Sequence, residues 1–259
     1  MRFPPAGLAT AVFGVILIAG VWVATTNRAQ DAISEAIASE FRKNQNLALA
    51  LDVQTHQLIK GVDQLVLVIK GQYERRGPHL PLDQLMPPPV VADESFTFIG
   101  VVDERGDVLE SLHGFAAINI ADREMFQAHQ ARDTGDLLIS APVLGRISGR
   151  WAITLSRRIN HPDGSFGGVA NISIEPRYLT EIFESATLGP NDMMSLVLLN
   201  GITLARRRGA VFEFGVDISG ASLFRHARAS RRATTSVRAA STATCGCSAT
   251  GRCRPTRCS

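Results

Sequence analysis

Residues 1–220 contain no cysteine, and this absence excludes disulfide bonds and thiol catalysis from the main body of the chain. The sequence also lacks the G-x-S-x-G nucleophile motif, the H-E-x-x-H zinc motif, the P-loop and a glycine-rich strand-to-helix fingerprint. His113 and His129 do not have the spacing of paired metal ligands. We therefore expect no catalytic residues, no bound metal and no cofactor, and we predict that the chain is not an enzyme.

Residues 225–259 contain no Leu, Ile, Met, Phe, Trp or Tyr and no Asp or Glu, but they hold eight arginines and all four cysteines of the chain. A segment with so few apolar side chains has almost nothing to bury, so residues 221–259 are predicted to be disordered. Their mixture of residues is typical of GC-rich DNA that is translated out of frame, and we interpret the tail as frameshifted. The alternatives are a natural basic tail and a zinc site, although the C-x-C spacing does not match the usual paired C-x₂-C ligands.

Charge is distributed unevenly along the chain, and the arginines of the tail make the net charge of the whole chain positive although that of residues 1–220 is negative. The whole chain has 27 Lys and Arg against 24 Asp and Glu, for a formal net charge of +3. Without the eight arginines of the tail, 19 basic residues face 24 acidic ones, so the body is mildly acidic. We therefore expect no nucleic-acid partner. A chain of 259 residues, 45% of them hydrophobic, can form one sizeable domain or two small ones.

Residues 3–27 carry no charge, and residues 7–25 within them are almost wholly apolar. A helix of this length spans about 28 Å, which matches the hydrocarbon thickness of a bilayer. A cleaved signal peptide is the alternative, but its apolar core is usually about 7–15 residues long and Ala24–Asn27 is a poor cleavage site. We therefore predict a single uncleaved transmembrane anchor at residues 7–25 in the cell inner membrane, with residues 1–6 cytoplasmic and the domain beyond it periplasmic.

Residues 28–76 contain no proline and are predicted to form a long stalk helix. Apolar side chains recur there at intervals of three or four residues: Leu58, Val62, Leu65, Ile69 and Tyr73. Gly77 and Pro78 stop this pattern. We expect the stalk to pack along a sheet and to transmit its position through the bilayer, and it could also pair with a second copy to form a homodimer.

After the stalk, the pattern changes from a helical to a strand period. The proline-rich residues 78–94 are predicted to form a connector that crosses back to a sheet. A short helix is predicted at residues 122–130, with Asp122 near its N-cap, and another at residues 176–186. This order predicts an α+β fold built from antiparallel hairpins. Predicted strands lie at residues 96–102, 108–112, 137–143, 151–159, 167–174, 194–199 and 202–206.

Several short runs follow one another in a specific order. Residues 122–129 read D-R-E-M-F-Q-A-H and lead into L-I-S-A-P at residues 138–142. The runs G-R-W-A-I-T-L-S-R-R-I at residues 149–159 and D-G-S-F-G-G-V at residues 163–169 come next. With the apolar segment and the long helix, they resemble the extracytoplasmic Cache sensor domains of bacterial membrane-bound diguanylate cyclases, sensor histidine kinases and chemoreceptors. The resemblance covers about residues 5–220 and implies a PAS-like antiparallel sheet.

The resemblance implies a double Cache domain whose second half is incomplete. Residues 78–186 would form the membrane-distal domain, and residues 190–220 would begin the membrane-proximal half, which the tail interrupts. The expected function is extracytoplasmic sensing of a small molecule by a membrane-bound signal-transduction receptor, truncated before its output domain. One alternative is a fragment of a diguanylate cyclase, whose G-G-D-E-F motif this chain lacks. Another is a membrane-anchored ligand-binding or dimerisation module without signalling output.

The resemblance also implies a small polar ligand, such as a carboxylate, in a pocket on the sheet. Arginine suits a carboxylate because its planar guanidinium donates two parallel hydrogen bonds. The period of two along residues 151–159 places Trp151, Ile153, Leu155 and Arg157 on one face, where the indole can form a pocket wall. Each candidate also has a structural reading: core packing for the aromatic residues, a helix-face position for the histidine, and an ion pair with Asp122 or Glu124 for the strand arginine. The candidate ligand-binding residues are Arg123, Phe126, His129, Trp151 and Arg157.

Overall fold

The computed structural model describes residues 5–78, 81–112, 114, 118–180, 192–221 and 240–241. The chain divides into two compact units, Met1–Leu47 and Ala48–Ser259. Helix α1 (Pro5–Arg76) begins in the first unit and continues into the second. The second unit also holds two antiparallel sheets and the short helices α2 (Leu82–Leu85), α3 (Pro88–Ala92) and α4 (Glu124–Ala131). This arrangement confirms the predicted α+β class.

Helix α1 has no break between Pro5 and Arg76, and it ends where the sequence predicts. Gly77 follows it with a φ of 77°, a left-handed conformation that glycine adopts without steric cost, and its N–H donates to the Tyr73 carbonyl at 2.8 Å. Among the residues that the structure describes, no helix is at once long enough and apolar enough to cross a membrane.

The first sheet has the strand order β2-β1-β6-β5-β3, and β4 pairs with β5 at the end of the sheet. All of its pairs are antiparallel, and the predicted hairpins β1–β2 and β5–β6 are confirmed. Its strands are β1 (Phe96–Val102), β2 (Val108–Ser111), β3 (Leu138–Ile139), β4 (Val143–Leu144), β5 (Trp151–Asn160) and β6 (Phe166–Ile174).

One predicted strand is wrong, because residues 137–143 form two short strands instead of one. The Ser140 N–H still donates to the Thr154 carbonyl at 2.9 Å, but the Thr154 N–H donates to the Ser140 hydroxyl, also at 2.9 Å, where a regular ladder would use a carbonyl. Pro142 then has no N–H to offer the neighbouring strand. The interruption separates β3 from β4, although both strands pair with β5.

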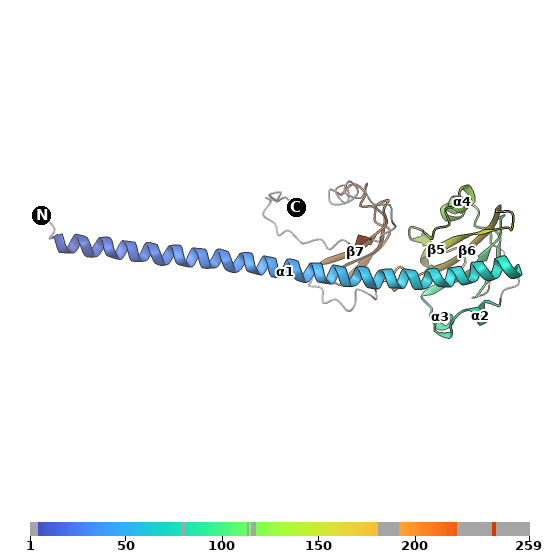
Figure 1. Ribbon diagram of the computed structural model, residues 1–259, viewed down its shortest axis with the longest axis horizontal. Coiled ribbons are helices and arrows are strands. Elements are labelled where there is room, and N and C mark those ends of the chain that lie inside the picture. Colours follow the sequence, from blue (N-terminus) through green and yellow to red (C-terminus); the bar gives the residue numbers. More distant parts are fainter. Residues whose placement is uncertain are drawn as a thin grey trace. The chain divides into compact units, whose positions relative to one another are not determined.

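Helices α1 and α4 lie on opposite faces of the first sheet (Figure 1). Arg157 of β5 contacts Asp63 of α1, whereas its neighbour Ser156 contacts His129 of α4. Side chains alternate between the two faces of a strand, so these contacts assign each face to one helix. A buried apolar cluster fills the space beneath α4 and consists of Phe98, Val102, Val108, Ile120, Met125, Phe126 and Val169.

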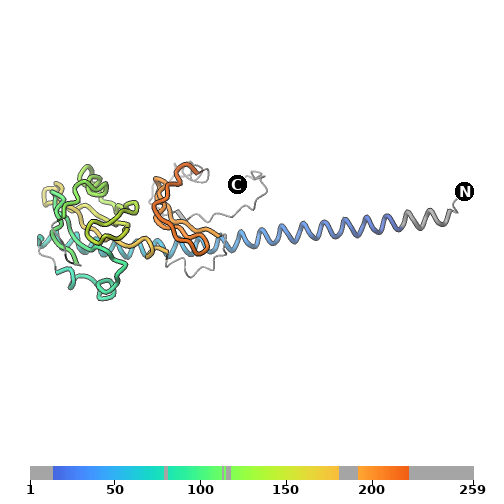
Figure 2. Tube along the Cα trace, turned by 180° about the vertical axis from the view of Figure 1, so that it is seen from behind, coloured from blue at the N-terminus to red at the C-terminus, as the bar shows by residue number. Residues whose placement is uncertain are grey.

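The second sheet has the strand order β10-β7-β8-β9, and its strands β7, β8 and β9 lie in the orange part of the trace in Figure 2. Asn200 and Gly201 form the predicted hairpin turn, with Gly201 at a φ of 97°. Its strands are β7 (Met193–Val197), β8 (Thr203–Arg208), β9 (Val211–Glu213) and β10 (Ala240–Ser241). Most of the helix predicted at residues 176–186 and all four cysteines of the tail lie outside the described residues.

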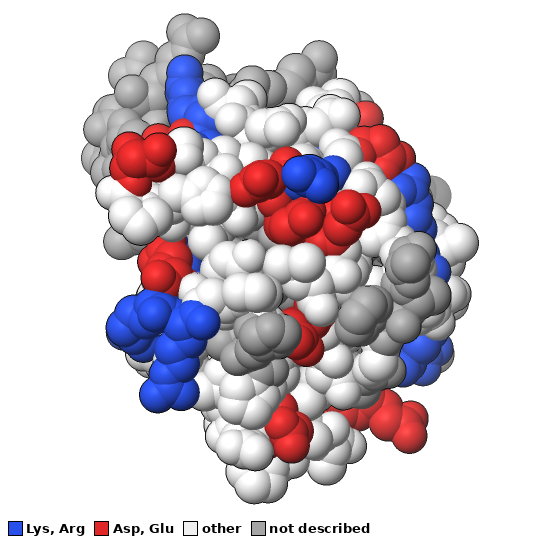
Figure 3. All heavy atoms as spheres, turned by 90° about the vertical axis from the view of Figure 1, so that its right-hand side faces the viewer, with Lys and Arg blue, Asp and Glu red and all other residues white. Residues whose placement is uncertain are grey.

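Charged side chains of both signs are interspersed on the face shown in Figure 3, where acidic side chains gather around a basic one. Such a distribution differs from the continuous basic surface that attracts a phosphate backbone. It fits the mildly acidic balance of the body of the chain.

Candidate ligand-binding site

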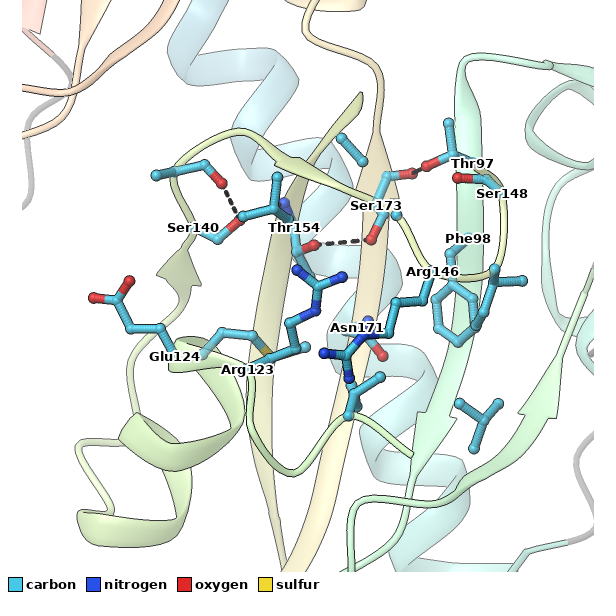
Figure 4. A pocket seen from close by; sticks show the side chains of 18 residues that line it. Thr97, Phe98, Arg123, Glu124, Ser140, Arg146, Ser148, Thr154, Asn171 and Ser173 are labelled. Carbon is cyan, nitrogen blue, oxygen red and sulfur yellow. Dashed lines mark hydrogen bonds between the residues drawn. The ribbon is translucent and has the colours of Figure 1, made fainter. Parts of the chain in front are cut away.

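A cavity of about 100 Å³ lies on the face of the first sheet that α4 covers. Four strands (β1, β2, β5 and β6), the first turn of α4 and residues 140–148 surround it (Figure 4). For scale, an engineered apolar cavity of about 150 Å³ holds benzene, which has six non-hydrogen atoms. The cavity opens to solvent at a mouth, so the part of a ligand that lies inside it is of roughly that size or smaller.

The floor of the cavity is polar although the surrounding sheet is apolar. Thr154 and Ser173 lie opposite each other on β5 and β6, and their hydroxyl oxygens are 2.9 Å apart. Thr97 on β1 donates to the Ser173 carbonyl at 3.3 Å. Asn171 lies two residues before Ser173 on the same face, and Figure 4 shows these side chains projecting from the central strands. We call Thr97, Thr154, Asn171 and Ser173 the polar floor.

The walls of the cavity are mainly apolar. They come from strands, from the segment before α4, from the first turn of α4 and from residues 141–147, so the cavity combines an apolar body with a few fixed polar groups, as small-molecule sites usually do. The apolar lining residues are Phe98, Val108, Ile120, Met125, Val143 and Ile147.

Two arginines tie residues 143–148, which we call the roof loop, to the segment that precedes α4. Arg146 donates to both carboxylate oxygens of Asp122, at 2.6 and 2.5 Å, and to the Asn119 carbonyl at 3.0 Å. This hydrogen bonding lowers the pKa of Asp122 below its ordinary value and raises the pKa of Arg146. Arg123 donates to the Leu144 carbonyl at 2.8 Å. Asp122 therefore holds the roof loop and does not act as the predicted N-cap of α4, a position that Arg123 occupies without a side-chain hydrogen bond.

Of the five candidate residues from the sequence, Arg123 lines the cavity. Phe126 is buried in the cluster beneath α4, with its ring against Phe166 at a centroid distance of 5.3 Å. Trp151 is 48% exposed, and its ring lies 5.4 Å from that of Phe214, close to the second sheet.

His129 and Arg157 are held by other residues, away from the cavity lining. The imidazole of His129 is buried, with Nε2 at 3.0 Å from the Ser156 hydroxyl, and burial lowers the pKa of this histidine. Arg157 pairs with Asp63 of α1 through two contacts, at 2.5 and 2.9 Å. An ion pair for Arg157 was one of the two readings of the sequence, but the partner is Asp63 and neither Asp122 nor Glu124.

The cavity uses the opposite face of β5 from the one that the sequence argument considered. Ala152 and Thr154 line it, whereas Ile153 and Leu155 point to the α1 side and are buried there. One signal in the sequence could have indicated this face: Thr154, Ser156, Asn171 and Ser173 are polar residues at a period of two within two otherwise apolar strands. Arg146 gave no such signal, because its contact with Asp122 spans 24 residues.

Comparisons with known proteins give the fold a context. No protein-family model and no curated protein matches the sequence. Among solved structures, the extracellular domain of rpHK1S-Z16, which is assigned to the histidine kinases, has a TM-score of 0.62 and 28% identity over 73% of this chain and 79% of that chain. An extracellular ligand-binding receptor from Desulfohalobium retbaense has a TM-score of 0.55 and 15% identity over 70% of this chain and 33% of that chain.

The chain has the fold of an extracytoplasmic Cache-type sensor domain. The resemblance noted in the sequence is thereby confirmed at the level of the fold. The ligand-binding domain of the Pseudomonas aeruginosa amino acid chemoreceptor PctC, in complex with GABA, is also similar, with a TM-score of 0.47 and 16% identity over 62% of this chain and 71% of that chain. Ligand-binding sensor domains of this kind are not catalytic, which agrees with the prediction that this chain is not an enzyme.

Proposed function

We propose that the chain is the extracytoplasmic sensing region of a membrane-bound signal-transduction receptor, in which a small polar ligand binds the cavity and shifts the first sheet against α1. The observation that carries this proposal is the position of the cavity and of α1 on opposite faces of the same two central strands, β5 and β6. A displacement of side chains on one face of a tightly packed sheet is transmitted to the other face, because packed interiors deform little.

The mouth of the cavity favours an anionic group on the ligand. Arg123 is half-buried there and forms no ion pair with any carboxylate in the described part of the chain. Its one hydrogen bond to the Leu144 carbonyl leaves other guanidinium N–H groups for a ligand. Arg146 is already neutralised by Asp122, so Arg123 is the residue that we assign to a carboxylate.

One route from the cavity to α1 runs along α4. The first turn of α4 lines the cavity, and at its other end Arg158 of β5 donates to the His129 carbonyl at 2.5 Å. The Arg158 carbonyl in turn accepts a hydrogen bond from Lys70 of α1 at 2.7 Å. A displacement of α4 can therefore reach α1 through a single residue of β5.

A second route uses Arg157, which points to the opposite face from Arg158. Its guanidinium binds Asp63 of α1 and also donates to the Gly135 carbonyl at 2.6 Å, in the segment between α4 and β3. The side chains of Arg157 and Asp63 are 16% and 20% exposed, so this pair is protected from most of the screening that weakens surface pairs. Both routes end on α1 within two turns of each other.

The membrane attachment of the receptor is part of the same proposal. The apolar side chains of α1 from Val15 to Val23 are at least half exposed, as expected for residues that face lipid. We assign residues 7–25 to a single-pass inner-membrane anchor and the sensor domain to the periplasm. The exposed Ile33, Ile37 and Phe41 recur at four-residue intervals and support pairing of two stalks in a homodimer.

The coding DNA can test which output domain the proposed receptor has. The 28% identity to rpHK1S-Z16 supports a histidine kinase, whereas a diguanylate cyclase rests on the sequence resemblance alone. Resequencing from the codon of Ala221 onward should reveal a frame change that opens onto an output domain. If the reading frame is correct to Ser259, the frameshift interpretation is wrong.

Ligand binding can be tested on the full chain in lipid nanodiscs, with a library of small carboxylates and thermal shift followed by calorimetry. At least one compound should bind, and Arg123→Gln should weaken it about 10-fold to 100-fold, the value of a hydrogen bond to a charged group. Arg132→Gln is the matched control, because Arg132 is an exposed arginine at the other end of α4. If no compound binds, or if both variants bind equally well, the proposed function is refuted.

A further inference from the structure

We infer that the ligand presents a neutral hydrogen-bond donor, a hydroxyl or an amide N–H, to the side-chain oxygen of Asn171. This inference rests on the proposed sensing function and specifies the chemistry of the ligand at the polar floor. Two features of the described residues carry it: Asn171 lines the cavity and has a buried carbonyl oxygen without a hydrogen-bond partner, and Arg123 at the mouth forms no ion pair there.

Asn171 is 4% exposed, and its Oδ1 is buried without a hydrogen-bond partner among the described residues. The register of the sheet explains why the protein leaves this atom unpaired. Directly across from Asn171 lie Gly100 on β1, which has no side chain, and Ser156 on β5. The Ser156 hydroxyl is occupied by His129 on the adjoining side. A buried polar atom without a partner is costly, so a ligand that supplies a donor to it gains affinity.

Gly100 supplies no side chain that could bond to Asn171, and β2 and Phe98 occupy the place where such a side chain would lie. A Cβ atom at this position would lie 2.2 Å from the Glu110 carbonyl oxygen and 2.7 Å from the Phe98 ring. Any larger residue would therefore push β2 or Phe98, and Phe98 itself is a wall of the cavity. Glycine at this point preserves the packing of β1 against β2 and the position of Phe98 in the cavity wall.

The donor is neutral because the polar floor has no negative charge. Its other members are hydroxyls, and the one carboxylate of the lining, Glu124, is exposed in the first turn of α4. An ammonium group that is taken out of water needs a carboxylate or several strong acceptors to offset the lost hydration. Arg123 at the mouth also opposes the entry of a cation. A neutral donor loses much less hydration on entering the cavity.

Size restricts the class further. The cavity of about 100 Å³ opens at its mouth, and the part of a ligand that lies inside it has about six non-hydrogen atoms. With a carboxylate at Arg123 and a donor at Asn171, the ligand class is a short carboxylate that bears a hydroxyl or a primary amide. Suitable probes are three-carbon carboxylates that differ only in the group on the second carbon. This group is a hydroxyl in lactate, an ammonium in alanine, a keto oxygen in pyruvate and hydrogen in propionate.

The test is calorimetric titration of the full chain in nanodiscs with both enantiomers of lactate and alanine, with pyruvate and with propionate. At least one lactate enantiomer should bind about tenfold more tightly than propionate, and alanine and pyruvate should bind no better than propionate. Asn171→Leu should reduce lactate to the affinity of propionate. Asn171→Asp should reverse the order, with alanine binding more tightly than lactate, because a carboxylate then faces the ammonium.

A purely structural role for Asn171 predicts different results. Because Asn171→Leu removes a buried carbonyl oxygen that has no partner among the described residues and keeps the side-chain volume, the ligand-free melting temperature should rise or stay level. A fall would overturn the inference, because it would indicate that the amide stabilises the fold. Asn160→Leu is a control at the far end of β5, where the side chain binds Asp133, and it should leave lactate affinity unchanged.

Each remaining outcome decides the inference. If alanine or pyruvate binds the wild-type chain more tightly than lactate, or if Asn171→Leu leaves lactate affinity unchanged, the neutral-donor inference is overturned. If none of these probes binds while other carboxylates in the library do, the inference fails and the proposed sensing function stands. If neither these probes nor the other carboxylates of the library bind, the neutral-donor inference and the proposed sensing function both fail.

Discussion

Breaking the ion pair between Arg157 and Asp63 should destabilise the domain and loosen α1 from the first sheet. The substitution Arg157→Met keeps the apolar part of the side chain and removes two hydrogen bonds to Asp63 and one to the Gly135 carbonyl. Breaking a buried pair costs about 3–5 kcal/mol and an exposed one about 0–1 kcal/mol. Because the two side chains are 16% and 20% exposed, we expect a loss of about 2 kcal/mol of unfolding free energy.

The assay is chemical and thermal denaturation of the full chain and of the variants Arg157→Met, Asp63→Asn and their combination. A loss of about 2 kcal/mol corresponds to a fall of about 4–8 °C in melting temperature for a domain of this size. The double-mutant cycle should give a coupling energy of about 1–2 kcal/mol, because either single change already breaks the pair.

The matched control is the pair formed by Lys43 and Glu40 on the same helix, whose side chains are 68% and 64% exposed. Glu40→Gln should cost no more than about 0.5 kcal/mol. Two results would contradict the view that Arg157 holds α1 against the first sheet. One is a coupling energy near zero for Arg157 and Asp63, and the other is a loss of unfolding free energy no larger than that of the control pair.

Two further predictions concern pH and the roof loop. Burial lowers the pKa of His129 from its ordinary 6.5, so its contribution to stability is complete above pH 6.5 and is lost as the pH falls from there towards the folded-state pKa. The unfolding free energy should therefore decrease as the pH falls below about 6.5, and His129→Gln should flatten this dependence; an unchanged slope would mean that another group titrates. Asp122→Asn should speed amide hydrogen exchange in residues 143–148, because the ion pair with Arg146 holds the roof loop, whereas Asp163→Asn in the β5–β6 turn should not. Equal exchange in both variants would show that the roof loop is held by other contacts.

Much of the fold could be predicted because its signals are local. Several elements follow from residues within a few positions of each other: the strand at residues 96–102, the hairpins at Asp163–Gly164 and Asn200–Gly201, and the end of α1 before Gly77. A glycine with positive φ or a turn residue acts on its own neighbours, so no knowledge of the tertiary structure is needed.

The failures all involve partners that are distant in sequence. Asp122 has the chemistry of an N-cap, but Arg146 competes for its carboxylate across 24 residues. The strand predicted at residues 137–143 breaks because the Ser140 hydroxyl takes the hydrogen bond of Thr154, 14 residues away. In each case the local preference was real, and a tertiary contact overrode it.

The α+β class and the long helix followed by antiparallel hairpins could be predicted without coordinates, because apolar periodicity and turn residues act through near neighbours. The resemblance to Cache sensor domains rested on the ordered runs between residues 122 and 169. Only the tertiary structure decided which face of β5 meets α1 and which forms the cavity. A strand with an apolar residue at nearly every position is compatible with either choice, since both of its faces are buried. The placement of Asp63 opposite Arg157, and of Gly100 and Ser156 on either side of Asn171, made that choice.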